Sequence, residues 1–136
     1  MPSLSVSLNC DRAELVRLAE LVDRFAAERA WSADDLTNVH LVLDELVSNV
    51  IRHGDTAGDG NVEVSLADDA GALTIDVIDN GIAFDPLARP APNLDLPIEQ
   101  RPIGGLGIHI VRTLAERISY RREDGRNHLS LTMRIG

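Results

Sequence analysis

Glu45 and Asn49 are the residues whose types and spacing point most directly to chemistry. They lie four positions apart in the stretch LVLDELVSNVIRH at 41–53, so on a helix they share one face. A carboxylate can accept a proton from an attacking hydroxyl or water, and a carboxamide oxygen can ligate Mg²⁺ without adding charge. The pair is therefore suited to phosphoryl transfer, although an ordinary solvated helix edge is the alternative interpretation.

Two further segments carry candidate chemistry. Asp79-Asn80-Gly81 ends an alternating strand pattern, and a carboxylate there either binds a ligand or forms a turn with Gly81. The run GGLG at 104–107 precedes an apolar helical pattern. Glycines at the start of a helix let backbone amides approach a phosphate at its positive end. Alone this signal is weak, because glycines also serve as plain turn residues.

The remaining sequence predicts the elements that position these residues. Period-2 alternation predicts strands over 3–9, 62–66, 73–77, 118–122 and 128–135, the last two joined by an Asp-Gly turn. Helical periodicity predicts one helix from an Asp11 cap, with Glu14 three residues later, to about Arg29. A second helix is capped by Ser32 or Asp34 and ends near Gly54. A third follows Gly107, with an apolar stripe reaching Ile118.

Residues 82–104 have no periodicity and contain five of the six prolines, a density that excludes regular structure. An irregular segment of about 20 residues in a small domain is more often a functional lid than a plain connection. The element order is strand, helix, helix, strand, strand, lid, helix, strand, strand. Hairpin-paired strands with helices on one face predict an α+β two-layer sandwich rather than a doubly wound parallel sheet.

Length and composition limit the class of protein. A chain of 136 residues predicts one domain over 1–136. No run approaches the about 18 apolar residues of a membrane span, and the residues after Met1 do not resemble a secretory signal, so we expect a cytoplasmic protein without a membrane partner. Cys10 is the single cysteine, so it has no internal disulfide partner and we assign it no role.

The net charge disfavours certain partners, and the absence of lysine excludes several kinds of site. The net charge of −9 disfavours a nucleic-acid backbone or an anionic membrane as the main partner. All 13 basic residues are arginine. Without a lysine the chain cannot form a Walker A loop, the strand lysine of an ordinary protein-kinase fold, or a Schiff base. If this protein binds ATP, it uses another architecture.

The ordered set of motifs resembles a known ATP-binding fold. Glu45 and Asn49, then Asp79 and Gly81, a lid, and the glycines before a helix resemble the N-box and two glycine boxes shared by gyrase, the ninety-kilodalton heat-shock chaperones, histidine kinases and MutL (GHKL). More narrowly, DELVSNVIRH, DNGIAFDP, GGLGIHIVR and GRNHLSLTMR resemble the small anti-sigma-factor serine-protein kinases, over roughly residues 1–136. The resemblance implies a Bergerat-type sandwich with a mixed, mostly antiparallel sheet, helices on one face, and an ATP lid at about 82–104.

By this resemblance each motif has an expected role. Glu45 would be the general base on the acceptor hydroxyl, and Asn49 would ligate Mg²⁺ between the phosphates. Asp79 would accept a hydrogen bond from the adenine amino group, and Gly81 would let the base lie against the backbone. The main-chain N–H groups expected to hold phosphates belong to Gly104, Gly105, Leu106 and Gly107.

Two positions beside these motifs affect nucleotide binding. Arg52 is a better candidate than His53 to lie near the nucleotide, because its charge does not depend on pH. Ala83 stands where the superfamily often has a second glycine of its first glycine box. Its methyl group could restrict the backbone and weaken ATP binding, but alanine is small and we expect it to be tolerated.

The function implied by the resemblance is an ATP-dependent serine protein kinase and anti-sigma regulatory factor. It would phosphorylate an anti-anti-sigma partner with a STAS-type domain in a partner-switching system, sequester a sigma factor when unphosphorylated partner is scarce, and form a homodimer through the first strand and helix. Direct nucleic-acid binding is not expected. A nucleotide-binding switch without phosphoryl transfer is the main alternative, and a partner-binding domain that has lost ATP is the third.

Overall fold

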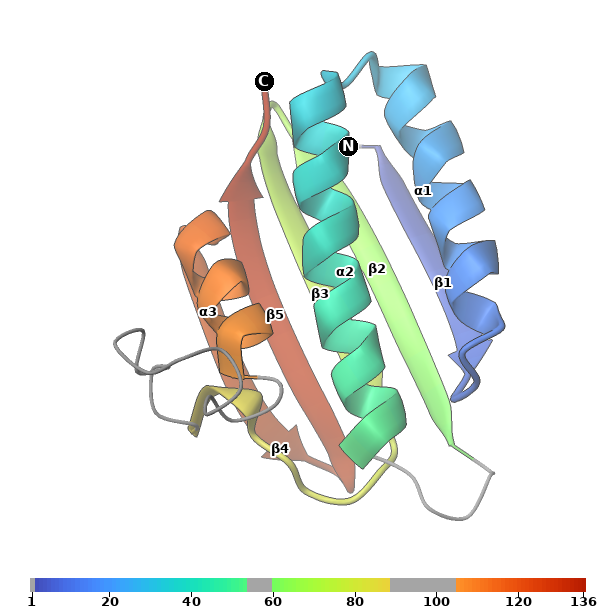
Figure 1. Ribbon diagram of the computed structural model, residues 1–136, viewed down its shortest axis with the longest axis vertical. Helices are drawn as coiled ribbons and strands as arrows, with labels where there is room; N and C mark the ends of the chain where they lie inside the picture. Colours follow the sequence, from blue (N-terminus) through green and yellow to red (C-terminus); the bar gives the residue numbers. More distant parts are fainter. Residues whose placement is uncertain (1, 54–59, 89–104) are drawn as a thin grey trace.

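The chain forms an α+β sandwich in which helices cover one face of a sheet (Figure 1). The computed structural model describes residues 2–53, 60–88 and 105–136. The elements in chain order are β1 (Ser3–Asn9), α1 (Glu14–Arg29), α2 (Ala33–His53), β2 (Asn61–Asp69), β3 (Ala72–Asp79), the short 3₁₀ helix η1 (Pro86–Ala88), α3 (Gly105–Leu114), β4 (Arg117–Glu123) and β5 (Arg126–Arg134). The order expected from the sequence is confirmed, with η1 as an addition inside the segment predicted to be irregular.

The sheet has five strands in the order β1-β2-β3-β5-β4. Every pairing among these strands is antiparallel, so the sheet, expected to be mixed and mostly antiparallel, contains no parallel pair in the described residues. The pairing of β3 with β5 places Asp79 opposite Asn127. The end of β3 is thus brought beside the start of a strand that lies almost fifty residues later in the chain.

The hydrophobic core lies between the sheet and the three helices. Alternate strand residues point toward the helices and are buried, as period-2 patterning requires: Leu8, Val62, Val64, Leu66, Leu73, Ile75, Val77, Leu129, Leu131 and Met133. The helices contribute Leu18, Val22, Phe25, Val39, Val42, Leu43, Leu46, Val47, Ile108 and Val111. This packing fixes α2 across the middle of the sheet with α1 and α3 on either side (Figure 1).

A local signal explains the start of α2 but not that of α1. The Ser32 hydroxyl accepts a hydrogen bond from the Asp35 amide at 3.1 Å, which caps α2 as expected. The expected cap of α1 by Asp11 is wrong. The N-cap position is Ala13, whose methyl side chain cannot make a cap bond. The Asp11 carboxylate instead accepts a hydrogen bond from the Ala13 amide at 3.0 Å, within the turn that precedes the helix.

The end of α3 also differs from the expectation. The helix stops at Leu114, and Ile118 belongs to β4. The Glu116 amide donates to the Thr132 carbonyl at 2.7 Å, so pairing with β5 ends the helical run before the apolar stripe does. The β4–β5 turn is as expected, with positive φ at Asp124 and Gly125.

The expected lid lies only partly within the structure. Of residues 82–104, the structure describes 82–88, and residues 89–104 lie outside the described part of the chain. The prediction of one domain over 1–136 stays a prediction. None of the described helices has the length and apolar content needed to cross a membrane.

Candidate nucleotide-binding and catalytic site

Glu45 and Asn49 lie on α2, on the side that faces α3. The Glu45 side chain is 19% exposed, and Asn49 is 6% exposed. They lie along the edge of the buried apolar face of α2. The packing of that face against the sheet fixes the position of the helix and therefore of both side chains. The helix edge expected to be either chemical or merely solvated is thus largely buried, which favours a site.

Arg52 links these two residues. Its Nη2 donates a hydrogen bond to Asn49 Oδ1 and lies 3.7 Å from Glu45 Oε1. Asn49 Nδ2, by contrast, has no hydrogen-bond partner among the described residues. An unsatisfied buried donor costs about 1–3 kcal/mol, so this atom is suited to a ligand oxygen.

The start of α3 closes against Glu45. A Cβ built on Gly107 would lie 2.2 Å from Glu45 Cδ and Oε2, which is far inside van der Waals contact. Only glycine admits the carboxylate in this position. The first residues of α3 are Gly105 and Leu106, whereas Gly104 lies outside the described residues. The proposed phosphate contacts of these four residues stay predictions.

Asp79 ends β3 and is 6% exposed. Its Oδ1 accepts two hydrogen bonds of 2.9 Å, one from the Gly81 amide and one from Asn127 Nδ2. The first is the turn contact considered from the sequence, and the second ties the carboxylate to β5. Asp79 is therefore held by two donors on the same oxygen.

The segment after Asp79 is anchored at several points. Arg122 donates to the Gly81 carbonyl at 2.7 Å, Arg112 donates to the Leu87 carbonyl at 2.6 Å, and the rings of Phe84 and His53 stack with centroids 4.4 Å apart. The stack gives His53 a structural role beside the first residues of the expected lid.

Ala83 lies exposed in this segment. It is not among the described residues with positive φ, so the backbone at this position does not require glycine. The effect of its methyl group on ATP binding stays a prediction.

Asn49 and Asp79 line one cavity, together with apolar side chains of α2, β3, β5 and the segment 84–86. Its volume is about 30 Å³, room for little more than a water molecule and far below the roughly 300–1,000 Å³ of typical ligand pockets. Phe84 and Pro86 are part of its lining. A purine base can enter this cavity only if side chains that line it move.

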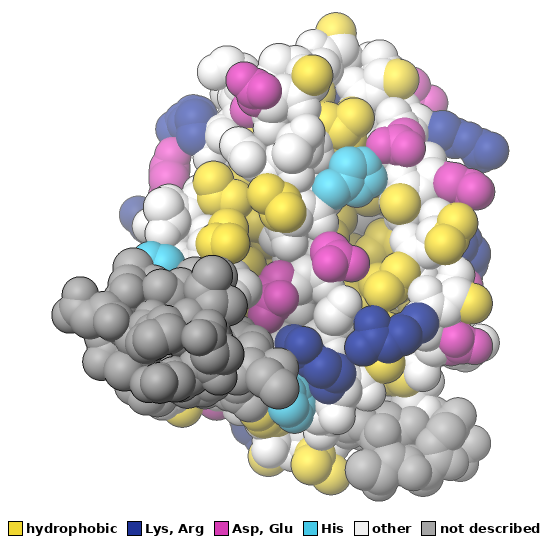
Figure 2. All heavy atoms as spheres, in the orientation of Figure 1, with side chains coloured by type: hydrophobic (Ala, Val, Ile, Leu, Met, Phe, Trp, Pro, Cys, Tyr) yellow, Lys and Arg dark blue, Asp and Glu magenta, His cyan; other side chains and the backbone are white. Residues whose placement is uncertain are grey.

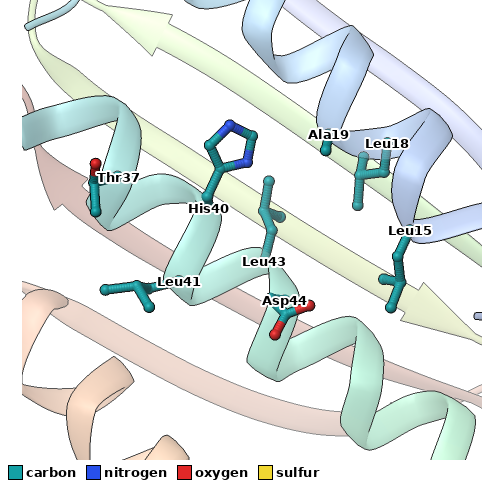
Figure 3. Close-up of a pocket in the computed structure, with 8 residues that line it drawn as sticks. All are labelled: Leu15, Leu18, Ala19, Thr37, His40, Leu41, Leu43 and Asp44. Atoms are coloured by element: carbon teal, nitrogen blue, oxygen red, sulfur yellow. The ribbon is translucent and has the colours of Figure 1, made fainter. Parts of the chain in front are cut away.

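A larger hollow lies elsewhere, between α1 and α2 (Figure 3). It measures about 390 Å³ and is lined by Leu15, Leu18, Ala19, Thr37, His40, Leu41, Leu43 and Asp44. The face of the molecule that carries the helices shows acidic and basic side chains dispersed among apolar groups (Figure 2). The residues with candidate chemistry do not line the hollow between α1 and α2, whereas Asn49 and Asp79 line the smaller cavity.

The residue types present fit Mg²⁺ only in combination with a nucleotide. The described residues contain no group of three or more His, Cys, Asp or Glu side chains that could hold a metal. Mg²⁺ is commonly bound by one or two protein ligands plus phosphate oxygens. Asn49 can supply one ligand, provided that Arg52 releases its Oδ1.

Asn127 is the site residue that sequence reasoning missed. It is 4% exposed and bonds to Asp79, yet we assigned it no role. The signal was available, because Asn127 continues the alternation of Leu129, Leu131 and Met133. A polar residue at an inward-facing position usually has a specific partner.

Comparisons with known proteins identify the family of this chain. Residues 8–133 match the family model described as a histidine kinase-like ATPase domain. The serine/threonine-protein kinase BtrW of Bordetella bronchiseptica is 30% identical over 112 residues, which cover 82% of this chain and 79% of BtrW. The serine-protein kinase RsbW of Bacillus thuringiensis is 28% identical over 119 residues, covering 84% of this chain and 74% of RsbW.

A solved structure gives the same fold. The RsbU and RsbW domains of Rv1364c from Mycobacterium tuberculosis superpose with a TM-score of 0.71 at 18% identity, over 99% of this chain and 33% of that chain. At this identity the likeness concerns the fold alone. The family match and the similarity to BtrW show that the chain belongs to the histidine kinase-like ATPase family, among relatives that include the serine-protein kinases BtrW and RsbW.

Proposed function

We propose that this protein is an ATP-dependent serine protein kinase and anti-sigma regulatory factor. Its substrate is an anti-anti-sigma protein with a STAS-type domain, and the two act with a sigma factor in a partner-switching system, in the cytoplasm and with the kinase as a homodimer. The observation that carries the proposal is the largely buried Glu45 carboxylate, one helical turn from Asn49 and against the first turn of α3. The names of its relatives, serine-protein kinases at 28–30% identity, support it.

The residues have distinct tasks in this reaction. ATP supplies the phosphoryl group, and Mg²⁺ neutralises charge on its phosphates. Asp79 accepts a hydrogen bond from the adenine amino group, and Asn49 contributes a metal ligand. Glu45 takes the proton of the acceptor serine as the new oxygen–phosphorus bond forms and ADP leaves. A positioned general base of this kind contributes about 10²–10⁴ in rate.

Nucleotide binding is tested by thermal unfolding with Mg-ATP, Mg-ADP and Mg-GTP. We expect adenine nucleotides alone to raise the melting temperature, because ligands that bind only the folded state stabilise it. Asp79→Asn removes the acceptor oxygen charge and should abolish this shift. Absence of any shift in the unaltered protein at millimolar nucleotide would refute the ATP site.

Phosphoryl transfer is tested separately with a STAS-domain partner and labelled ATP. Glu45→Ala should lower turnover by about 10²–10⁴ while the adenine-specific thermal shift is retained. Equal turnover in the two proteins would refute the role of Glu45.

One observation favours a second candidate function, a nucleotide-binding switch that regulates a partner without phosphoryl transfer. Arg52 holds the Asn49 oxygen that a metal would need for phosphoryl transfer. A switch would bind its partner with an affinity that depends on nucleotide, and Glu45→Ala would not change that affinity. No phosphorylated partner would form with either protein. Phosphorylated partner in the labelling assay would exclude it.

A further inference from the structure

Asn127 makes more hydrogen bonds than a scaffold residue at the start of a strand requires. Its Nδ2 donates to Asp79 Oδ1 at 2.9 Å and to the Ile82 carbonyl at 2.8 Å. Its Oδ1 accepts from the Phe84 amide at 3.2 Å and from the Tyr120 hydroxyl. Both donor hydrogens and both acceptor sites of the carboxamide are therefore used, at a residue that is 4% exposed.

These bonds join two parts of the site. One part is the carboxylate of Asp79, and the other is the chain at 82–84, which leads into the expected lid. Since Asn127 is fixed by strand pairing opposite Asp79, it holds both parts to the rigid sheet.

The pattern of donors also fixes which oxygen of Asp79 is available. Two N–H groups, from Gly81 and Asn127, converge on Oδ1. Rotation of the carboxylate would break both bonds, so Oδ2 is the oxygen left for a ligand. A fixed acceptor recognises the exocyclic amino group of adenine and meets an oxygen at the same position of guanine. Loss of one donor lets the carboxylate rotate and weakens this discrimination.

We propose that Asn127 is a positioning residue that orients Asp79 for adenine and couples the purine site to the chain segment at 82–84. The inference rests on the proposed function, because it assigns Asn127 to the same nucleotide site. It predicts that altering Asn127 changes the preference for ATP over GTP and not merely the affinity for nucleotides in general.

Two substitutions separate the donor and acceptor roles. Asn127→Asp keeps an oxygen for the Phe84 amide and the Tyr120 hydroxyl, but it replaces the amide donor with a second carboxyl that repels Asp79. Asn127→Leu removes both functions at similar volume. Asn9→Asp and Asn9→Leu are matched controls, because Asn9 is exposed and lies on β1, two strands from Asp79.

The first measurement is the ratio of the ATP and GTP dissociation constants for each folded variant, with folding checked by circular dichroism. We expect the preference for ATP, measured as the GTP dissociation constant divided by the ATP dissociation constant, to fall about tenfold in both Asn127 variants. This is the effect of one lost hydrogen bond to a charged group. The preference should be unchanged in the controls. A role in folding alone would weaken ATP and GTP equally, and a ratio within twofold of the unaltered protein would overturn the proposal.

Amide hydrogen exchange in nucleotide-free protein is the second measurement. The Phe84 amide should exchange faster in Asn127→Leu and remain protected in Asn127→Asp. Equal protection in both variants would overturn the coupling to segment 82–84 even if selectivity changed. If the unaltered protein binds neither ATP nor GTP while the two variants still show this exchange pattern at Phe84, the proposed function and the adenine role of Asn127 both fail. Only the link between Asn127 and segment 82–84 is then supported.

Discussion

Substitution of Gly107 by alanine should separate stability from catalysis. Gly107 is the third residue of α3 and has an ordinary helical φ, so its backbone accepts an alanine. The new Cβ would lie 2.2 Å from Glu45 Cδ and Oε2 and 2.5 Å from Oε1. Non-bonded heavy atoms settle near about 3.5 Å, so the carboxylate must retreat by about 1 Å.

The two consequences have different sizes. The displaced atoms are the end of a flexible side chain, which can move at little cost, and alanine in a helix is about 1 kcal/mol more favourable than glycine. The folded protein should therefore be as stable as before or slightly more stable. A displacement of about 1 Å at a catalytic group can cost about 10²-fold in rate, equivalent to about 2.7 kcal/mol of transition-state stabilisation.

The assay is phosphorylation of a STAS-domain partner, measured beside urea unfolding of the same samples. Gly107→Ala should lower kcat about 10²-fold without lowering the free energy of unfolding. Gly71→Ala is the opposite control, because Gly71 has φ +90° and a Cβ there would lie 2.8 Å from the Ile135 carbonyl oxygen. That variant should lose stability and keep its turnover at temperatures where it stays folded.

A double-mutant cycle decides whether the effect acts through Glu45. In a Glu45→Ala background the carboxylate is gone, so adding Gly107→Ala should change the residual rate little. Equal losses in the two backgrounds would refute the reasoning and indicate that Gly107 acts on the phosphates or on α3 itself.

Two further predictions concern the metal and the core. Arg52→Gln should lower the Mg²⁺ concentration at which ATP raises the melting temperature, because the guanidinium no longer holds Asn49 Oδ1; an unchanged Mg²⁺ requirement would contradict this competition. Ile75→Ala, at a fully buried position, should lower the free energy of unfolding by about 2–5 kcal/mol, whereas Val16→Ala, at a residue 63% exposed, should change it by less than about 0.5 kcal/mol. Similar losses in urea unfolding would show that the core is misassigned.

The sequence was most informative where periodicity and packing agree. Strand alternation and the stripe on α2 follow from burial on one face, which a linear pattern records directly, and the two-layer α+β fold was predicted correctly. The cap of α1 and the end of α3 were not, because both depend on competing bonds. Asp11 is used in a turn, and the Glu116 amide is captured by β5. The second contact depends on Thr132 in another strand, which a local sequence pattern does not reveal.

The candidate site divides in the same way. Glu45 and Asn49 share a helix, so their spacing alone places them together. The approach of Gly107 to Glu45 and of Asn127 to Asp79 is created by packing of α3 on α2 and of β5 on β3. A glycine before a helix and an asparagine after a turn have common local explanations, so only the assembled structure shows what each one contacts.

The small cavity beside Asp79 links nucleotide binding to the segment that precedes the expected lid. A base cannot occupy about 30 Å³, so it can enter this cavity only if lining side chains such as Phe84 withdraw, and the Phe84 ring is held by its stack with His53. Part of the binding free energy is then used to break these contacts. The apparent affinity for ATP equals the affinity of the open state multiplied by the fraction of molecules in that state. Loosening the stack by Phe84→Ala should therefore tighten ATP binding, and weaker binding in that variant would show that the Phe84 ring serves the nucleotide and does not obstruct it.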